Sequence, residues 1–308
     1  MKLWYYRDPA GNFGDDLNPW LWSRLLPGFF DGRPDSLFLG IGTIIRAGLP
    51  AAARKVVLGS GMGYGEPPHL DPTWEFHCVR GPLTAARLGL PASLAATDAA
   101  ALVSTVFDGG RYPRRAVSFM PHHVSATLFD WRPLCRRLGI RYVDPTAAVE
   151  PTLAALAGSR LVIADAMHAA ILADTLRVPW VPVTIYGHAN PFKWNDWCAS
   201  LDLNYEPVRL PAPFDNSNER PLRRLRGYAR RIMRTRKLTR HGRRPDQEVS
   251  GPELIQRVAD GLADVRDHPD RAVLSEATVF ADRVARLTAA LDQLRAGKPG
   301  FVPPPPRD

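Results

Sequence analysis

Cysteine is scarce in this sequence, and the few cysteines are isolated. Cys78, Cys135 and Cys198 lie far apart in a chain of 308 residues. Their spacing excludes a Cys-x-x-Cys motif, a Cys/His metal site and a disulfide framework. A chain of this length buries a sizeable core without such links, so we expect it to fold in a reducing compartment.

Long apolar runs are also missing. Arg7 and Asp8 interrupt the apolar residues near the N-terminus, which excludes the apolar stretch of a signal peptide. No uncharged run approaches the roughly 18 residues that a membrane-spanning helix needs. The sequence therefore predicts a soluble, cytoplasmic protein.

Acidic residues are absent from one segment. From Arg220 to Arg244 there are 12 Lys and Arg and no Asp or Glu, and subtracting them from the net charge of +9 leaves −3. The basicity is therefore local and does not mark the whole chain as a nucleic-acid binder. Apolar residues recur through this basic segment at helical spacing, namely Leu222, Leu225, Ala229, Ile232 and Met233.

This pattern is typical of an amphipathic helix at an anionic membrane surface. Several arginines near such a surface suffice for peripheral attachment, at about 1 kcal/mol each. An RNA-binding segment and a solvated linker are the alternatives. Tyr228 is the one aromatic residue in the segment, so the stacking platform of a single-strand binder is missing, and no nucleic-acid partner is expected.

Apolar strand-like runs alternate with helical segments through residues 2–201. The expected strands are 2–6, 36–39, 55–58, 75–79, 116–120, 141–143, 161–164 and 180–184. The expected helices between them are 15–26, 82–88, 131–138, 146–156, 167–176 and 195–201. Continuous apolar runs are typical of buried parallel strands, and the alternation favours an α/β architecture.

A Gly/Pro/Arg cluster at residues 108–115 predicts a boundary between two α/β lobes. We expect the lobes at 1–112 and 113–210, a linker and the basic segment at 211–250, and C-terminal helices with a Pro-rich tail at 251–308. Residues 207–218 have the composition of a linker. The last helix carries an apolar stripe that predicts core packing, and the Pro-rich end is expected to fray.

Two adjacent carboxylates follow the first expected strand, in the sequence GNFGDD. Asp15 and Asp16 lie where a helix begins, so they can cap its free N–H groups. Because ligands bind at the carboxyl ends of parallel strands, the same position suits a base that accepts the proton of a substrate hydroxyl. The sequence leaves both interpretations open.

Four glycines alternate in GSGMGYG, which begins at Gly59. Glycine allows the backbone to approach a ligand closely, and Gly61 is the candidate for such a contact. The pattern departs from G-x-G-x-x-G and lacks the Lys-Ser/Thr of a P-loop. Dinucleotide binding therefore has weak support, and a turn without a ligand is the alternative.

Arg80 ends a strand in VRGPLT, where Gly81 and Pro82 begin a helix. Proline is favoured in the first turn of a helix. An arginine beside a helix N-terminus makes a site for phosphate or carboxylate. An ordinary surface arginine is the alternative.

Histidines follow two later strands in the same position. MPHHVS holds His122 and His123, and ADAMHAA holds Met167 and His168 among small residues. This shared position at strand ends favours one common site with Arg80 over purely structural histidines. The histidines lack the spacing of zinc ligands, so no metal is expected.

The segment FKWNDWC carries Lys193 between aromatic residues. Lys193 can bring positive charge into a site or lie at its rim. Trp194 and Trp197 can form a platform for a sugar ring, and core packing is the alternative.

As a set, several segments resemble the bacterial exopolysaccharide pyruvyl transferases: NFGDDLNPW, GIGT, GSGMGYG, VRGPLTAARLGL, TDAA, MPHH, ADAMHAAILADTLRVPWVPV and FKWNDWCASLDL. The resemblance covers about residues 1–205 in collinear order. It implies a GT-B-like α/β fold with two Rossmann-like lobes, parallel sheets and C-terminal helices. It also implies transfer of pyruvate from phosphoenolpyruvate (PEP) to two sugar hydroxyls of a glycan or lipid-linked oligosaccharide, giving a cyclic ketal and phosphate.

The resemblance assigns PEP binding to Arg80 and His168, with Met167 beside the histidine. Ala169 follows this histidine where many relatives have glycine. PEP is a polyanion that needs cationic groups, and its reaction needs an acid, a base and anion stabilisation. We expect Arg80 to bind the carboxylate or phosphate of PEP, and His168 to bind phosphate and deliver a proton.

The other candidates serve the acceptor or either substrate. Asp15 or Asp16 is expected to orient or deprotonate the acceptor hydroxyl, and His122 to assist catalysis. The remaining substrate-binding candidates are Asn12, Gly61, His123, Lys193 and Trp194. Neither a metal nor a cofactor is expected, because the arginine and histidines supply positive charge and PEP is itself the donor substrate.

Two other functions stay open at this point. A nucleotide-sugar-dependent glycosyltransferase of the same fold needs a nucleoside pocket and an acid that reaches the ribose, and the second lobe offers no convincing acid of this kind. An RNA-associated protein would act through residues 220–244. Under the transferase interpretation, the protein is cytoplasmic and attaches to the inner face of the membrane through that segment.

Overall fold

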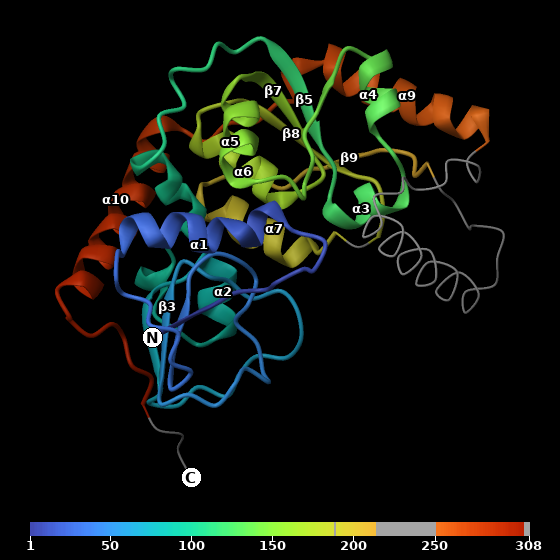
Figure 1. The fold of residues 1–308 in the computed structure, drawn as a ribbon. Helices are drawn as coiled ribbons and strands as arrows, with labels where there is room; N and C mark the ends of the chain where they lie inside the picture. Colours follow the sequence, from blue (N-terminus) through green and yellow to red (C-terminus); the bar gives the residue numbers. More distant parts are fainter. Residues whose placement is uncertain (188, 214–250, 305–308) are drawn as a thin grey trace, which may run out of the picture.

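The computed structural model describes residues 1–187, 189–213 and 251–304, which form an α/β protein with two parallel sheets (Figure 1). The predicted two-lobe, GT-B-like architecture is confirmed. The basic segment from Arg220 to Arg244 lies outside the described residues. Each helix that is described is too short or too polar to span a bilayer.

The first lobe contains four parallel strands in the order β1-β2-β3-β4. The Leu, Phe and Val residues at the C-terminal ends of β2 and β3 are fully buried, as their apolar sequence predicts. Helix α1 connects β1 to β2, whereas loops connect the later strands. The elements are β1 (Lys2–Trp4), α1 (Phe13–Leu25), β2 (Ser36–Leu39), β3 (Arg54–Leu58), β4 (Trp74–Cys78), α2 (Pro82–Arg87), η1 (Ala92–Leu94) and η2 (Ala99–Thr105).

The second lobe contains five parallel strands in the order β6-β5-β7-β8-β9. Its first strand in the chain is the second in the sheet, so the connections diverge between β5 and β7. In doubly wound sheets, ligands bind outside the carboxyl ends of the strands at this point. The elements are β5 (Ala116–Met120), α3 (His123–Leu128), α4 (Arg132–Arg137), β6 (Arg141–Tyr142), α5 (Val149–Ala157), β7 (Ser159–Ala164), α6 (Met167–Thr175), β8 (Trp180–Thr184), α7 (Pro191–Ser200) and β9 (Val208–Arg209).

One apolar cluster joins the two lobes. Leu17 and Trp22 of α1 belong to the same buried cluster as Ile171 and Leu172 of α6 and Leu287 of the last helix. Burial of apolar surface stabilises by about 25 cal/mol per Å². The cluster therefore holds the two sheets in a fixed relation and sets the width of the space between their strand ends.

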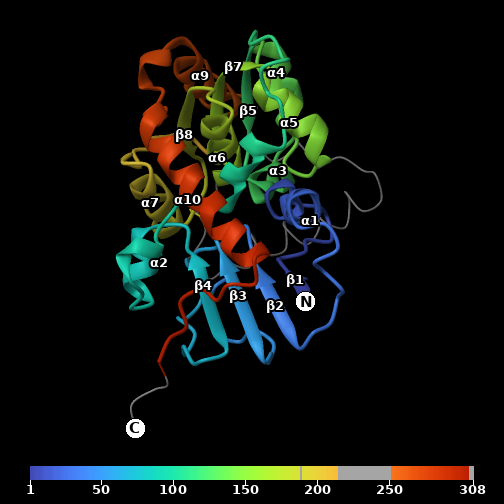
Figure 2. The ribbon, with the colours of Figure 1, turned by 90° about the vertical axis from the view of Figure 1, so that its left-hand side faces the viewer.

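The C-terminal helices pack on both lobes. Helix α9 (Pro252–Asp267) packs against the second sheet through Val258 and Leu262, and η3 (Pro269–Arg271) follows it. Helix α10 (Ala277–Arg295) then runs from the second lobe to the first (Figure 2). The apolar stripe predicted on this helix is confirmed as core, since Phe280, Leu287, Leu291 and Leu294 are buried.

The prediction that the Pro-rich end frays is wrong as far as Phe301. Phe301 exchanges both backbone hydrogen bonds with Phe76 of β4, each at 2.8 Å, so the chain is held to the first sheet up to this residue. Strand β9 pairs with β8 inside the lobe expected at 113–210, at the start of the stretch whose composition predicts a linker. Helix α3, directly after β5, is also absent from the predicted elements.

Candidate active site

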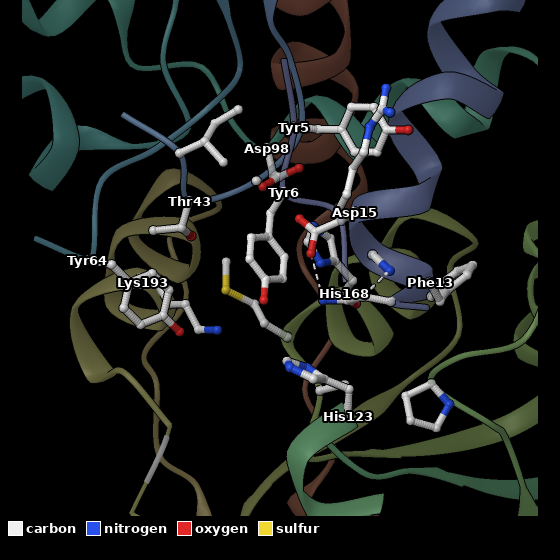
Figure 3. Close-up of a pocket in the computed structure, with 18 of the residues that line it drawn as sticks. Tyr5, Tyr6, Phe13, Asp15, Thr43, Tyr64, Asp98, His123, His168 and Lys193 are labelled. Atoms are coloured by element: carbon white, nitrogen blue, oxygen red, sulfur yellow. Dashed lines mark hydrogen bonds between the residues drawn. The ribbon is translucent and has the colours of Figure 1, made fainter. Parts of the chain in front are cut away.

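A cavity of about 780 Å³ lies where the strand ends of the two lobes face each other. The first lobe lines it with residues that follow β1, β2 and β4, and the second lobe with residues that follow β5 and β7 (Figure 3). Most of the second-lobe residues come from the divergence point between β5 and β7, as the topology predicts, and Lys193 joins them from helix α7, which follows β8. The predicted site residues that line the cavity are Asn12, Asp15, Arg80, His122, His123, Met167, His168 and Lys193.

Arg80 reaches the cavity but is paired within the protein. Its side chain is 0% exposed, and its Nε donates to Oδ2 of Asp196 at 2.9 Å. Nη1 donates to Oγ1 of Thr43 at 2.7 Å, and Nη2 donates to the Met62 carbonyl at 2.6 Å. Each terminal nitrogen keeps a second N–H, so Arg80 can still donate to an anion, although Asp196 compensates most of its charge.

Gly61 makes room for this arginine. A Cβ at Gly61 would lie 2.3 Å from Cζ of Arg80, closer than any two carbon atoms can approach without a bond. Gly61 does not line the cavity. A group does approach the backbone of Gly61 closely, as predicted, but this group is the Arg80 side chain and not a ligand.

Asp196 is a positioning residue that sequence reasoning missed. The carboxylate is 0% exposed, and besides Arg80 it accepts hydrogen bonds from the backbone N–H of Thr84 at 2.8 Å and from its Oγ1 at 2.6 Å. Asp196 lies on α7 and Thr84 on α2, so this network ties the second lobe to the Arg80 turn. The only sequence signal was an acid within the FKWNDWC segment.

Lys193, also on α7, points its ammonium into the cavity (Figure 3). The residue is 9% exposed, and the centroid of the Tyr64 ring lies 5.5 Å from Nζ. Among the described residues no hydrogen bond or ion pair holds Nζ, although its charge acts on the Asp15 carboxyl. A cation in a cavity with little solvent attracts an anion more strongly than one in open water, so this position favours an anionic ligand.

His168 is the second residue of helix α6. Its Nε2 is buried and has no hydrogen-bond partner among the described residues, and a Cβ at Gly14 would lie 2.0 Å from its Nδ1. Glycine in the GNFGDD turn thus lets α1 pack directly on the imidazole. Burial, with the positive charges of Lys193 and Arg80, lowers the pKa of His168 to about 3, so the ring is neutral at neutral pH.

The N-terminus of α6 offers further donors. Its N-cap is Ala166, which has no side-chain acceptor for the first N–H groups of the helix. Ala166, Met167 and His168 all line the cavity. Uncapped N–H groups and the helix dipole attract anions, and Lys193 adds its charge at the same cavity.

Asp15 and Asp16 have different surroundings. Asn12 is the N-cap of α1; its Nδ2 donates to Oδ2 of Asp15 at 2.6 Å, and its backbone N–H donates to Asp16 at 3.3 Å. Asp15 lines the cavity and Asp16 does not. Asp16 therefore braces the helix start, and Asp15 faces the cavity.

Burial is the largest influence on Asp15. It raises the pKa of this carboxyl to about 7, Lys193 acts in the opposite direction, and Asp16, Asp8 and Asp98 add to the rise. A carboxyl that exchanges its proton near neutral pH is suited to general acid–base catalysis.

Asp98 is a second cavity carboxyl, and sequence reasoning did not select it. The residue is 1% exposed, and its Oδ1 accepts from the Ala100 N–H at 3.0 Å as the N-cap of η2. Its Oδ2 is buried without a partner. Burial raises the pKa of Asp98 to about 6, opposed by Arg80. The signal was present in TDAA, one of the segments that carry the family resemblance.

His122 and His123 line the cavity from the start of α3. Nδ1 of His122 accepts from the Val124 N–H at 3.3 Å, and its own backbone N–H donates to Asp165 at 2.8 Å. His123 Nε2 lies 4.0 Å from Asp8 Oδ2. His122 therefore acts as an N-cap, and the turn that Asp165 braces holds both rings at the cavity wall.

Trp194 is a correction to the predicted site. It is 1% exposed, stacks on Tyr205 with ring centroids 4.8 Å apart, and packs near Trp180 and Trp197. It does not line the cavity. The alternative of core packing holds, because α7 turns this face toward the apolar cluster shared by both lobes.

Other aromatic residues line the cavity in its place. Tyr5 and Tyr6 directly follow β1, and Tyr64 lies in the loop after β3 (Figure 3); the hydroxyl residue Thr43, which follows β2, also lines the cavity. None of them was selected from the sequence. Their common signal is position after a parallel strand, but loops of irregular length hide which side chain reaches the cavity.

Comparison with known proteins adds one curated relative to this geometry. The chain is 45% identical over 218 residues to the succinoglycan biosynthesis protein ExoV of Rhizobium meliloti (strain 1021), and the match covers 68% of this chain and 68% of the relative. No model of a known protein family matches the chain. At this identity and coverage, the chain belongs to the family of the succinoglycan biosynthesis protein ExoV.

Proposed function

We propose that the protein transfers the pyruvyl group of PEP to two hydroxyls of a sugar during exopolysaccharide biosynthesis, forming a cyclic ketal. The observation that carries the proposal is the Lys193 ammonium, which faces the cavity and makes no ion pair with a described residue. The relative's name, a succinoglycan biosynthesis protein, supports a glycan acceptor. The resemblance of the strand-end motifs to pyruvyl transferases supports PEP as the donor.

The donor's negative charge has several partners in the cavity. Lys193, the free N–H groups of Arg80 and the uncapped N-terminus of α6 favour an anion. The neutral imidazole of His168 can donate or accept one hydrogen bond at Nε2, and a bound anion would raise its pKa from about 3. We therefore assign PEP binding to His168. The proton delivery expected of His168 is assigned instead to carboxyl groups with raised pKa values.

Asp15 and Asp98 are suited to complementary roles. The pKa is raised to about 7 for Asp15 and to about 6 for Asp98. At a pH between these values, Asp15 is the protonated acid of the pair and Asp98 the ionised base. Neither role needs a metal or a cofactor, because PEP carries both the carbon unit and the leaving group.

The reaction is then balanced in protons. Asp15 gives its proton to C3 of PEP; the first acceptor oxygen bonds to C2 while Asp98 takes the hydroxyl proton. The C2–O bond to phosphate breaks, and Asp98 returns the proton to the departing phosphate. The second acceptor oxygen bonds to C2 and gives its proton to Asp15, which restores both carboxyls.

The test combines binding with turnover. PEP binding is measured by calorimetry, and phosphate release is followed with succinoglycan oligosaccharides from which mild acid has removed acid-labile ketals. We expect PEP-dependent phosphate release, a product with the mass of a pyruvyl ketal, and no turnover of UDP-glucose. Turnover of UDP-glucose without binding of PEP would overturn the proposal in favour of a nucleotide-sugar glycosyltransferase.

We also propose that the protein acts in the cytoplasm and attaches to anionic membranes through residues 220–244, on the evidence of their charge and apolar spacing. Flotation with vesicles that contain phosphatidylglycerol tests this. We expect the full chain to float with these vesicles and not with neutral ones, and deletion of residues 220–244 to abolish flotation while PEP binding is kept.

A further inference from the structure

The cavity holds more than the groups that the donor needs. Its volume of about 780 Å³ lies in the upper part of the roughly 300–1,000 Å³ typical of small-molecule sites. PEP is a small anion of a single three-carbon unit and a phosphate. Much of the cavity is therefore left for a second, larger ligand.

Two tyrosines face this remaining space. Among the described residues, the exposed large hydrophobic side chains are Tyr6 (49%), Tyr64 (43%), Leu83 (37%) and Val302 (43%). Both aromatic members of this set line the cavity, and neither of the aliphatic ones does. Exposed aromatic faces that gather at one concave site mark a binding surface.

The two rings come from separate loops of the first lobe. Tyr6 follows β1, and Tyr64 follows β3; in the view of Figure 3, Tyr6 projects between Lys193 and Tyr64 on one side and Asp15 and His168 on the other. Neither tyrosine hydroxyl hydrogen-bonds to a described residue. The Lys193 ammonium lies over one face of the Tyr64 ring, but both rings keep exposed surface for stacking. Their hydroxyls are available for hydrogen bonds, close to the carboxyl that exchanges protons.

The chemistry of these groups selects the ligand class. The C–H face of a pyranose ring is apolar and stacks on aromatic rings, while its hydroxyls need polar partners. Asp15 and Asp98 on the same cavity disfavour a second polyanion such as a nucleic acid. We propose that Tyr6 and Tyr64 form a carbohydrate-binding subsite that presents a sugar ring of the acceptor to Asp15, an inference that rests on the proposed function.

The experiment measures carbohydrate binding without the donor. Saturation-transfer NMR with mild-acid-treated succinoglycan oligosaccharides reports contact with the wild-type protein and with Tyr6→Ala and Tyr64→Ala. We expect each alanine variant to weaken oligosaccharide binding about tenfold or more, and Tyr6→Phe and Tyr64→Phe to keep most of it because the ring remains. Leu83→Ala, an equally exposed residue outside the cavity, is the matched control and should bind as the wild type does.

Two results would overturn the subsite: no oligosaccharide binding to the wild type, or binding to both alanine variants that is as strong as binding to the wild type. Because the assay contains no PEP, its result is independent of the donor. Failure of PEP to bind the wild type would instead remove the proposed transferase reaction and leave the carbohydrate result standing.

Discussion

The two lobes present positive charge to one cavity in opposite ways. Arg80 of the first lobe is 0% exposed and paired with Asp196, whereas Lys193 of the second lobe is 9% exposed and has no counterion among the described residues. A charge that is paired inside the protein helps to hold the fold together, whereas a charge without such a partner can bind a ligand. Proximity to a cavity therefore does not by itself show which cation binds the substrate.

The largest expected effect comes from breaking the ion pair between Arg80 and Asp196. Arg80→Ala leaves the Asp196 carboxylate buried without its partner, and we expect the free energy of unfolding to fall by about 3–5 kcal/mol. Urea denaturation measures this. The double variant Arg80→Met with Asp196→Leu removes both charges and should recover most of the loss; a single variant as stable as the wild type would refute the pairing.

A second variant tests the contact between the lobes at His168. Gly14→Ala puts a Cβ against the imidazole, 2.0 Å from Nδ1, and overpacking of this kind costs about 1–3 kcal/mol. We expect lower stability and weaker PEP binding together, because the ring that must move also lines the cavity. Gly187→Ala, where nothing lies within 4 Å of the added Cβ, is the control and should change neither quantity.

Removal of the Lys193 charge should change the affinity for PEP and not the stability of the fold. Lys193→Met is expected to raise the Kd for PEP about tenfold or more, equivalent to about 1.4 kcal/mol, while the unfolding midpoint in urea stays the same or rises. Lys55→Met is the matched control, since Lys55 donates to Thr73 in the first sheet, away from the cavity. Unfolding as severe as in Arg80→Ala would contradict the contrast between the two cations.

The smallest effect concerns pH. A carboxyl whose pKa is raised on folding stabilises the fold at low pH, and this stability is lost as the pH rises through the raised value. For Asp15 the raised pKa is about 7. The free energy of unfolding of Asp15→Asn, minus that of the wild type, should therefore be larger at pH 8.5 than at pH 5.5. A stability difference between Asp15→Asn and the wild type that is the same at both pH values would contradict the raised pKa of Asp15.

The sequence predicts the strands well because buried parallel strands are continuous apolar runs. It also predicts residues that directly follow a strand, such as His122 and His168, because topology alone puts strand ends at the cavity. Asp196 lies 116 residues from Arg80, and no local pattern reveals such a partner. Thr43 and Tyr64 were missed because they lie in loops, and Trp194 was misplaced because the helical face it occupies depends on tertiary packing.

The central claim is that cationic and histidine groups from both lobes hold one PEP molecule. A crystal structure of the protein with PEP tests it most directly. We expect the phosphate or carboxylate of PEP to lie within hydrogen-bond distance of Lys193 Nζ and His168 Nε2 from the second lobe and of a terminal nitrogen of Arg80 from the first lobe, with the Arg80–Asp196 pair intact. PEP bound outside the cavity, or within it but out of reach of Lys193, would contradict the account.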